Sequence, residues 1–357
     1  MLTLSLLMAA WYKRACIIHG HFFNNTLFKK HRHFSEKVYT GATMQKSTFS
    51  NVSYITVDPD FAGQRIDNFL TTRLKGVPKT KIYKILRKGE VRVNKKRVQP
   101  SYRIESGDMV RVPPLHLEER PALEAPGQSL MTLLSTSILY EDKNLFIINK
   151  PAGIPVHGGS KVKIGVIEAL RCMYPKLPHL ELAHRLDADT SGCLVMAKKR
   201  GVLKEVHELL RNGQVNKIYW ALTKGSWMPS ELRVDVPLLK NQMSSGERIV
   251  RVNPEGKTAL TVFKPLKTFT DAMLVEATLF TGRTHQIRVH AQYRGHPIAG
   301  DEKYGDREFN KKMRECGLKR MFLHATSVGF DLPSTGQRVQ VSAPLSPALE
   351  NCLNHLD

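Results

Sequence analysis

The stretch HRLDADTSG, from His184 to Gly192, brings the carboxylates of Asp187 and Asp189 close to a histidine and an arginine. A carboxylate can act as nucleophile, base or acid, but it needs a cationic partner to stay ionised where water is excluded. Asp189 precedes Thr-Ser-Gly, an ordinary turn signature, so we interpret it as a turn residue. Asp187 follows Leu186 and can point inward. The residue types alone leave a catalytic and a structural interpretation of Asp187 open.

A distant stretch, TGRTHQIRVH, could supply the cationic partner. In it, Gly282 and Arg283 precede a helix that we expect to start near Thr284. An arginine there can hold a carboxylate in a bidentate pair. The sequence therefore predicts an ion pair between Arg283 and Asp187.

The elements around these stretches are mostly short apolar strands separated by Gly and Pro turns, from residue 138 onward. Only a few segments have helical spacing, among them 166–173 and 202–210. No GxGxxG follows a strand, which excludes a dinucleotide-binding pattern. This pattern predicts a mixed, strand-dominated α+β domain with Asp187 on a loop between core elements.

A smaller α+β unit precedes that domain. Apolar positions recur at helical spacing over 64–74, a second short helix opens near Thr80, and two alternating segments around Gly, Asn and Asp predict short strands. Between Arg73 and Arg97 the unit carries eleven basic residues and one acid, Glu90. A solvated charged face is one interpretation, and we favour a surface that contacts phosphates.

The whole chain of 357 residues has a formal charge of +22, which makes a polyanion the default partner, nucleic acid first. No apolar run is long enough for a transmembrane helix. The five cysteines are scattered and form no CxxC, and no HExxH occurs, so we expect neither a disulfide framework nor a metal site. A reducing compartment fits best.

The chain divides into four predicted parts. Residues 1–52 are an extension, either disordered or translated from a mis-assigned start, with a transit peptide and hence an organellar location as the alternative. The small basic unit covers 53–114, a linker rich in proline and glutamate covers 115–135, and the large domain covers 136–357.

Four ordered motifs resemble those of the RluA-type RNA pseudouridine synthases. HRLDADTSG resembles the catalytic motif of that family, NKPAG (149–153) its first motif, KIYWAL (217–222) the strand of its active-site tyrosine, and TGRTHQIRVH (281–290) its third motif. The basic unit is similar to the S4 RNA-binding domain. The resemblance implies an S4-like module followed by a mainly antiparallel α+β catalytic domain that isomerises uridine in RNA without a cofactor.

Carried over position by position, the resemblance makes Asp187 the catalytic aspartate, Tyr219 the ring that packs on the target base and Arg283 the partner of Asp187. Arg185 would help hold the flipped-out nucleotide, and Leu323 would line the pocket. Within the family, the chain is most similar to members that act on 23S rRNA, so the implied partner is 23S rRNA or its precursor. We expect a monomer.

Further contacts to RNA or substrate are predicted at basic residues of the motifs and of the small unit. They are His184, Lys150, Lys217 and Arg288 in the large domain, and Lys79, Lys81, Lys84, Arg87, Lys88, Lys95, Lys96 and Arg97 in the small unit.

Two other classes of function compete with this one. A non-catalytic RNA-binding or ribosome-assembly protein with an S4-type module would be equally basic, but it would not need Asp187, Tyr219 and Arg283 together. A small-molecule hydrolase or transferase is disfavoured by the charge and by the lack of GxSxG or P-loop patterns.

Overall fold

The computed structural model describes residues 51–74, 77–115, 125–159, 162–227, 230–242 and 248–356. The predicted extension, 1–52, therefore lies outside the described residues except for its last two positions.

The N-terminal module, residues 51–115, joins two helices to a small sheet. The helices are α2 (Ile66–Arg73) and α3 (Lys79–Arg87), as the apolar spacing predicts, and they bury Phe69, Ile82 and Ile85. The strands are β1 (Ser53–Thr56), β2 (Arg92–Val93), β3 (Lys96–Arg97) and β4 (Met109–Val112), in the order β1-β4-β2-β3.

A tight turn joins β2 to β3 in this module. Asn94 and Lys95 form it with φ values of 48° and 68°. Both central residues of a two-residue hairpin turn of this kind need a positive φ, which asparagine tolerates better than most residues. The basic side chains of Lys95, Lys96 and Arg97 in and after this turn are exposed.

The predicted linker is partly wrong. Residues 116–124 lie outside the described part, but Gln128–Ser135 form helix α4. Leu134 is fully buried and Leu130 packs against the same apolar core. The proline-rich composition ends at Gly127, and the following SLMTLL has enough apolar residues for one face of a helix. The other domain boundaries remain predictions.

The large domain is built on a ten-stranded sheet with strand order β10-β13-β14-β9-β15-β8-β6-β5, from which β16 pairs with β15 and β7 with β8. Every described pairing in it is antiparallel except β15 with β8, so the predicted mainly antiparallel α+β fold is confirmed. The strands are β5 (Ile138–Glu141), β6 (Leu145–Lys150), β7 (Glu181–Leu182), β8 (Ser191–Ala197), β9 (Asn216–Lys224), β10 (Leu232–Asp235), β13 (Leu260–Thr268), β14 (Ala272–Leu279), β15 (Leu323–Leu332) and β16 (Gln337–Ser342).

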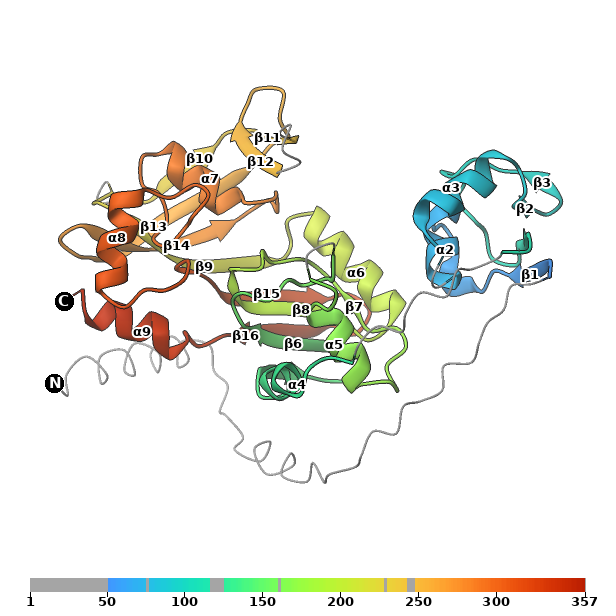
Figure 1. Ribbon diagram of the computed structural model, residues 1–357, viewed down its shortest axis with the longest axis horizontal. Helices are drawn as coiled ribbons and strands as arrows, with labels where there is room; N and C mark the ends of the chain where they lie inside the picture. The colour runs from blue at the N-terminus through green and yellow to red at the C-terminus, as the bar shows by residue number, and fades with distance from the viewer. Residues whose placement is uncertain are drawn as a thin grey trace. The chain divides into compact units, whose positions relative to one another are not determined.

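Helices cover the two halves of this sheet separately (Figure 1). Helix α5 (Val166–Met173) and helix α6 (Arg200–Arg211) lie with α4 beside the half that contains β8 and β6. Helix α7 (Gln286–Tyr293) packs near β13 and near the hairpin of β11 (Leu238–Gln242) and β12 (Arg248–Val252). Helix α8 (Arg307–Glu315) and helix α9 (Pro347–Asn354) form a second apolar cluster with β9 and β14.

The parallel contact between β15 and β8 sets the position of the loop before β8. Gly192 pairs with Ala325 and has a φ of +108°. A β-carbon on Gly192 would run into the backbone of Ala325, so only glycine fits this approach. The loop 187–190 therefore leaves the sheet beside the start of β15.

Candidate active site

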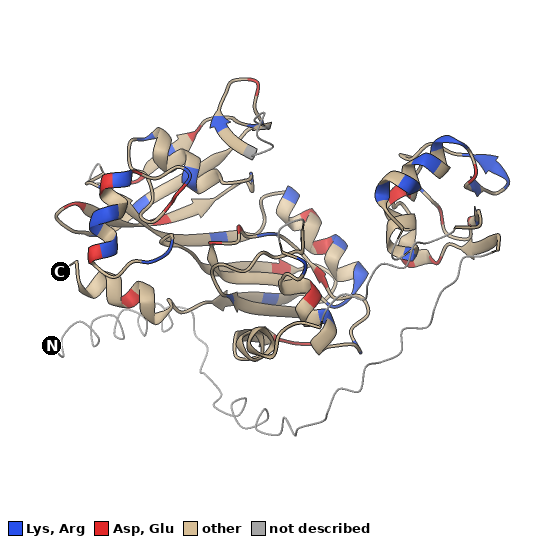
Figure 2. Ribbon diagram, in the orientation of Figure 1, with Lys and Arg blue, Asp and Glu red and all other residues tan. Residues whose placement is uncertain are grey.

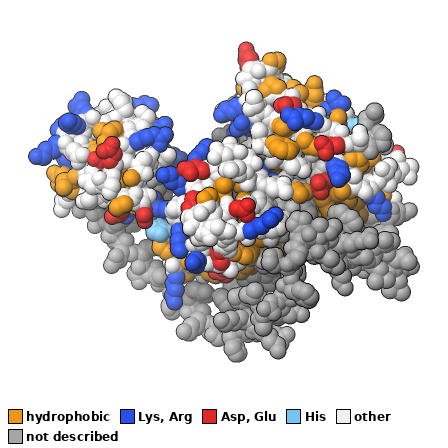
Figure 3. Space-filling model, turned by 180° about the vertical axis from the view of Figure 1, so that it is seen from behind, with side chains coloured by type: hydrophobic (Ala, Val, Ile, Leu, Met, Phe, Trp, Pro, Cys, Tyr) orange, Lys and Arg blue, Asp and Glu red, His pale blue; other side chains and the backbone are white. Residues whose placement is uncertain are grey.

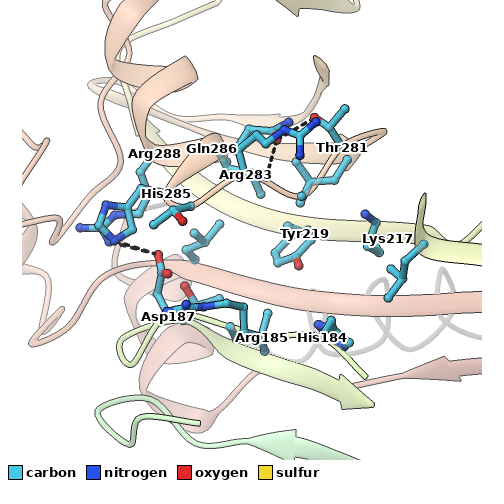
Figure 4. Close-up of a pocket in the computed structure, with 18 of the residues that line it drawn as sticks. His184, Arg185, Asp187, Lys217, Tyr219, Thr281, Arg283, His285, Gln286 and Arg288 are labelled. Atoms are coloured by element: carbon cyan, nitrogen blue, oxygen red, sulfur yellow. Dashed lines mark hydrogen bonds and ion pairs between the residues drawn. The ribbon is translucent and has the colours of Figure 1, made fainter. Parts of the chain in front are cut away.

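A cavity of about 480 Å³ opens where the loop before β8, the strand β9 and the start of α7 meet (Figure 4). It contains most of the residues that the motifs single out. Asp187, Tyr219, Arg283 and Leu323 all line it, although they come from four separate segments of the chain. The structure therefore brings the predicted catalytic set together.

The cationic partner of Asp187 is Arg288, not Arg283. Arg288 Nη1 donates to Asp187 Oδ2 at 3.2 Å, and its Nε and Nη2 donate to both carboxylate oxygens of the buried Asp301 at 2.7 and 2.8 Å. Burial disfavours the charged forms, but the two carboxylates raise the pKa of Arg288, and its hydrogen bonds lower the pKa of Asp301. Arg288 was predicted to contact RNA, but two carboxylates already occupy its guanidinium.

Arg283 lines the same cavity on the opposite side of the helix start. Its Nε donates to the carbonyl of Thr258 at 2.9 Å, and its backbone N–H donates to Gln286 Oε1 at 3.0 Å. The predicted ion pair with Asp187 is wrong because α7 begins at Gln286, two residues later than expected. Arg288 then lies on the first turn of the helix and reaches the carboxylate.

His285 stands between Arg283 and the helix in a left-handed conformation, with φ of 54°. Its Nδ1 is 2.8 Å from the hydroxyl of Tyr304, and its Nε2 is 3.8 Å from Asp187 Oδ2. The Tyr304 hydroxyl accepts the N–H of Val250, so it can donate its own proton to Nδ1. Burial lowers the pKa of His285, which favours a neutral ring whose Nε2 proton faces Asp187.

Tyr219 and Leu323 form the apolar wall of the cavity. Their side chains are 7% and 4% exposed, and they come from the neighbouring strands β9 and β15. Burial raises the pKa of Tyr219, so its hydroxyl is neutral near pH 7. A buried aromatic ring beside an aliphatic side chain provides a surface on which a planar base can stack.

His184, Arg185 and Lys217 line the cavity as predicted, but of the three only Arg185 is an exposed cation of the kind that RNA contacts would need. Burial lowers the pKa of His184 to about 4, and its Nε2 accepts the N–H of Val195 at 3.1 Å, so it is a neutral structural acceptor. Burial also lowers the pKa of Lys217. Arg185 is exposed and lines the cavity two residues before Asp187 in the chain.

Lys150 does not meet the prediction that it contacts RNA. It is fully buried, and its Nζ donates to the carbonyls of Pro151, Ile154 and Ala188 at 2.7 to 2.9 Å. Burial lowers its pKa to about 7. The backbone N–H of Gly153 also donates to Ala188 at 2.8 Å. The NKPAG segment therefore holds Ala188, the residue that follows Asp187.

The predicted basic residues of the N-terminal module lie at its surface. Figure 2 shows Lys and Arg concentrated along α3 and the β2–β3 hairpin, and Figure 3 shows such side chains on the exterior of the module. Lys81 is half-buried, and the other seven are exposed: Lys79, Lys84, Arg87, Lys88, Lys95, Lys96 and Arg97.

Three contributors to the site were missed by sequence reasoning: the pairing role of Arg288, and the residues Asp301 and Tyr304. Arg288 belongs to TGRTHQIRVH, so the motif contained it, but the choice between two arginines depended on where the helix begins. Asp301 and Tyr304 belong to the segment GDEKYGD, which carries three acids around a tyrosine after a glycine. That cluster was the available signal.

Neither a metal centre nor a membrane span is found in the described part of the chain. No three His, Cys, Asp or Glu side chains there are grouped to hold a metal ion, and none of the helices described is long and apolar enough to cross a bilayer.

Several known proteins are similar to this chain. Residues 144–293 match the RNA pseudouridylate synthase family, and residues 64–110 match the S4 domain. The chain is 52% identical over 314 residues to ribosomal large subunit pseudouridine synthase C of Salmonella typhimurium (strain LT2), covering 87% of this chain and 98% of the relative. It is 51% identical, with the same coverage, to the enzyme of that name from Escherichia coli (strain K12).

A solved structure of human RNA pseudouridylate synthase domain containing 4 is also similar. It shares 31% sequence identity and gives a TM-score of 0.53, covering 64% of this chain and 95% of the human one. The resemblance inferred from the four motifs is confirmed. The chain belongs to the RNA pseudouridylate synthase family.

Proposed function

We propose that the protein converts specific uridines of 23S rRNA into pseudouridine, with Asp187 as the essential catalytic residue. The observation that carries this proposal is the pairing of Asp187 with Arg288 at a cavity whose wall is Tyr219 and Leu323. Relatives over half identical along nearly their whole length are named for the large ribosomal subunit, which supports this substrate.

The reaction is an isomerisation and needs no redox change. The bond between uracil N1 and ribose C1′ breaks, the base turns within the pocket, and C5 joins C1′; N1 gains a proton and C5 loses one. Asp187 either attacks C1′ or removes the C2′ proton to give a glycal. Both routes require an ionised, aimed carboxylate, which the 3.2 Å contact with Arg288 supports.

The target nucleotide must leave its stack before Asp187 can reach the sugar, which costs a few kcal/mol. Arg185 is exposed beside Asp187 and can fill the space that the flipped nucleotide leaves. The extruded uracil then stacks on Tyr219. Because the tyrosine hydroxyl is neutral, stacking and hydrogen-bond donation are its roles before the final loss of the C5 proton.

Affinity for RNA comes from phosphate contacts, for which the exposed basic residues on α3 and the β2–β3 hairpin are the main candidates. RNA shape and unpaired bases select the site. We propose a monomer in the bacterial cytoplasm without cofactor, since the relatives are bacterial and the chemistry needs no electron carrier.

The proposal is tested with a 23S rRNA transcript carrying tritium at uridine C5. The full chain should release tritium to water, one per modified uridine, and Asp187→Asn should release none while it still binds the transcript. Binding without release by the wild-type chain would favour the alternative of a non-catalytic RNA-binding or ribosome-assembly protein.

A further inference from the structure

A second cavity, of about 790 Å³, adjoins the first at the catalytic carboxylate. The two cavities share Asp187, Arg185, Leu186, His285 and Arg288. From there the second cavity extends along residues 152–157, 300–303 and 318–321. If the base of a nucleotide fills the first cavity and its sugar faces Asp187, the attached phosphates can extend from this junction into the second cavity.

The second cavity has more basic than acidic side chains. Among its charged residues, Asp187 and Asp301 are already held by Arg288, and Glu302 lies 3.5 Å from Arg314. Asp189 is the remaining acid and is exposed. The other charged residues that line the cavity are Arg185, Lys303, Lys319 and Arg320.

Arg320 is held in place by a chain of hydrogen bonds. Its Nη2 donates to Ser191 Oγ at 2.6 Å, and its Nε donates to the carbonyl of Met321 at 3.2 Å. The fully buried His324 donates from Nε2 to the carbonyl of Ala343 at 3.1 Å, so its Nδ1 accepts the proton of Ser191, 2.8 Å away. Each donor in this chain of bonds therefore has an acceptor, and the two bonds of Arg320, which use two of its five N–H groups, hold the guanidinium in position.

No carboxylate among the residues that the structure describes lies within ion-pair distance of Arg320. Burial lowers the pKa of its guanidinium, and the negative charge of Asp189 partly offsets that effect. A half-buried, oriented arginine without a paired carboxylate, in a cavity beside a sugar site, suits an anionic oxygen of the substrate. In RNA the only such oxygens are those of the phosphodiesters.

We propose that the second cavity binds a phosphodiester that flanks the target uridine, with Arg320 as its main ligand and Lys319 as an auxiliary cation. Ser191 and His324 are positioning residues that aim the guanidinium. This inference rests on the proposed function, because the target nucleotide must occupy the first cavity for its backbone to reach the second.

The test combines a change in the protein with a change in the RNA. The substrate is an oligonucleotide that carries a uridine mapped as modified by the wild-type chain, in which each flanking phosphodiester in turn is replaced by a neutral methylphosphonate. Tritium release gives kcat/KM for the full chain and for Arg320→Gln. An exposed arginine outside both cavities, Arg233, provides the control Arg233→Gln.

Wild type should lose about 10-fold in kcat/KM on one of the methylphosphonate RNAs, as expected for one charge-assisted hydrogen bond. Arg320→Gln should lose about as much on the unmodified RNA and almost nothing more on that methylphosphonate. Arg233→Gln should behave as wild type does. The phosphate site would be contradicted if the loss from Arg320→Gln and the loss from the methylphosphonate multiply at both flanking positions. It would also be contradicted if neither methylphosphonate lowers kcat/KM.

Two further variants keep the test decisive. Lys319 is exposed, so Lys319→Gln cannot disturb the core and should reduce the methylphosphonate effect in part. Ser191→Ala should raise KM with little change in kcat. It should also lose less in kcat/KM than wild type does when the flanking phosphodiester is replaced by a methylphosphonate. A wild-type chain that modifies no uridine contradicts the proposed function. An active enzyme in which Arg320→Gln and the methylphosphonate act independently contradicts only the phosphate site.

Discussion

Arg288 Nη1 lies 3.2 Å from Asp187 Oδ2 although 101 residues separate them in the chain. The same guanidinium holds the buried Asp301 with two further hydrogen bonds, so one cation serves one half-buried and one buried carboxylate. Removing it affects both the fold and the site.

Arg288→Gln should therefore lower the free energy of unfolding by about 3 to 5 kcal/mol, because it leaves a buried carboxylate unpaired. Arg283→Gln should change it by less than about 0.5 kcal/mol, since Arg283 is exposed. Urea titration of the two matched variants measures the difference. A larger loss from Arg283→Gln than from Arg288→Gln would contradict the assigned pairing.

Two substitutions of Tyr219 distinguish the stacking of its ring from the action of its hydroxyl. Tyr219→Phe keeps the ring, so substrate binding should change by less than about 3-fold, and any loss of kcat reports the hydroxyl. Tyr219→Leu removes the stacking surface and should weaken binding of RNA by about 10-fold or more, since stacking of a base on an aromatic ring contributes about 1 to 3 kcal/mol. Single-turnover rates and binding titrations distinguish the two. Equal effects of Phe and Leu on binding would refute the stacking role.

The module's basic surface should control affinity and its salt dependence. Replacing Arg87 and Lys88 by Gln should weaken RNA binding and reduce the slope of log affinity against log salt by about 1.4, or about 0.7 per lost phosphate contact on single strands. At saturating RNA, kcat should stay unchanged. Replacing the exposed Arg233 and Lys264 removes the same charge elsewhere and provides the control. Identical slopes in both variants would show that the module makes no special contact.

His324 should make the fold sensitive to acid. Burial lowers its pKa to about 4, whereas the unfolded chain takes up that proton near pH 6.5. Between these values the unfolded state binds more protons, so the free energy of unfolding falls as pH falls from 6.5 to 4, by up to about 1.4 kcal/mol per pH unit. Urea titrations at several pH values should show a shallower decline in His324→Gln. Equal slopes would rule out this linkage.

Much of the fold was predictable from local pattern. Apolar spacing predicted α2, α3, α5 and α6, and alternating apolar runs predicted the strands, because these elements bury one face against a single core. The sequence does not predict helix α4, because its short apolar pattern adjoins a proline-rich segment. Strand order and the parallel pairing of β15 with β8 depend on contacts between distant segments, which no local pattern reports.

The sequence predicts which residues line the candidate site, but not which arginine pairs with Asp187. Asp187, Tyr219, Arg283 and Leu323 share one cavity, as the motifs indicated. Which arginine pairs with Asp187 depended on the left-handed turn at His285, a tertiary feature that delays the helix start. Lys150 was misjudged although it ends the apolar run LFIIN, a signal that its side chain is buried.

The catalytic role of Asp187 is tested by mapping pseudouridine in 23S rRNA from cells that lack the gene and are complemented with the wild-type chain or with Asp187→Asn. Specific sites should disappear in the deletion, return with wild type and stay absent with Asp187→Asn at equal protein level. Sites restored equally by both chains would show that Asp187 is not essential for the reaction.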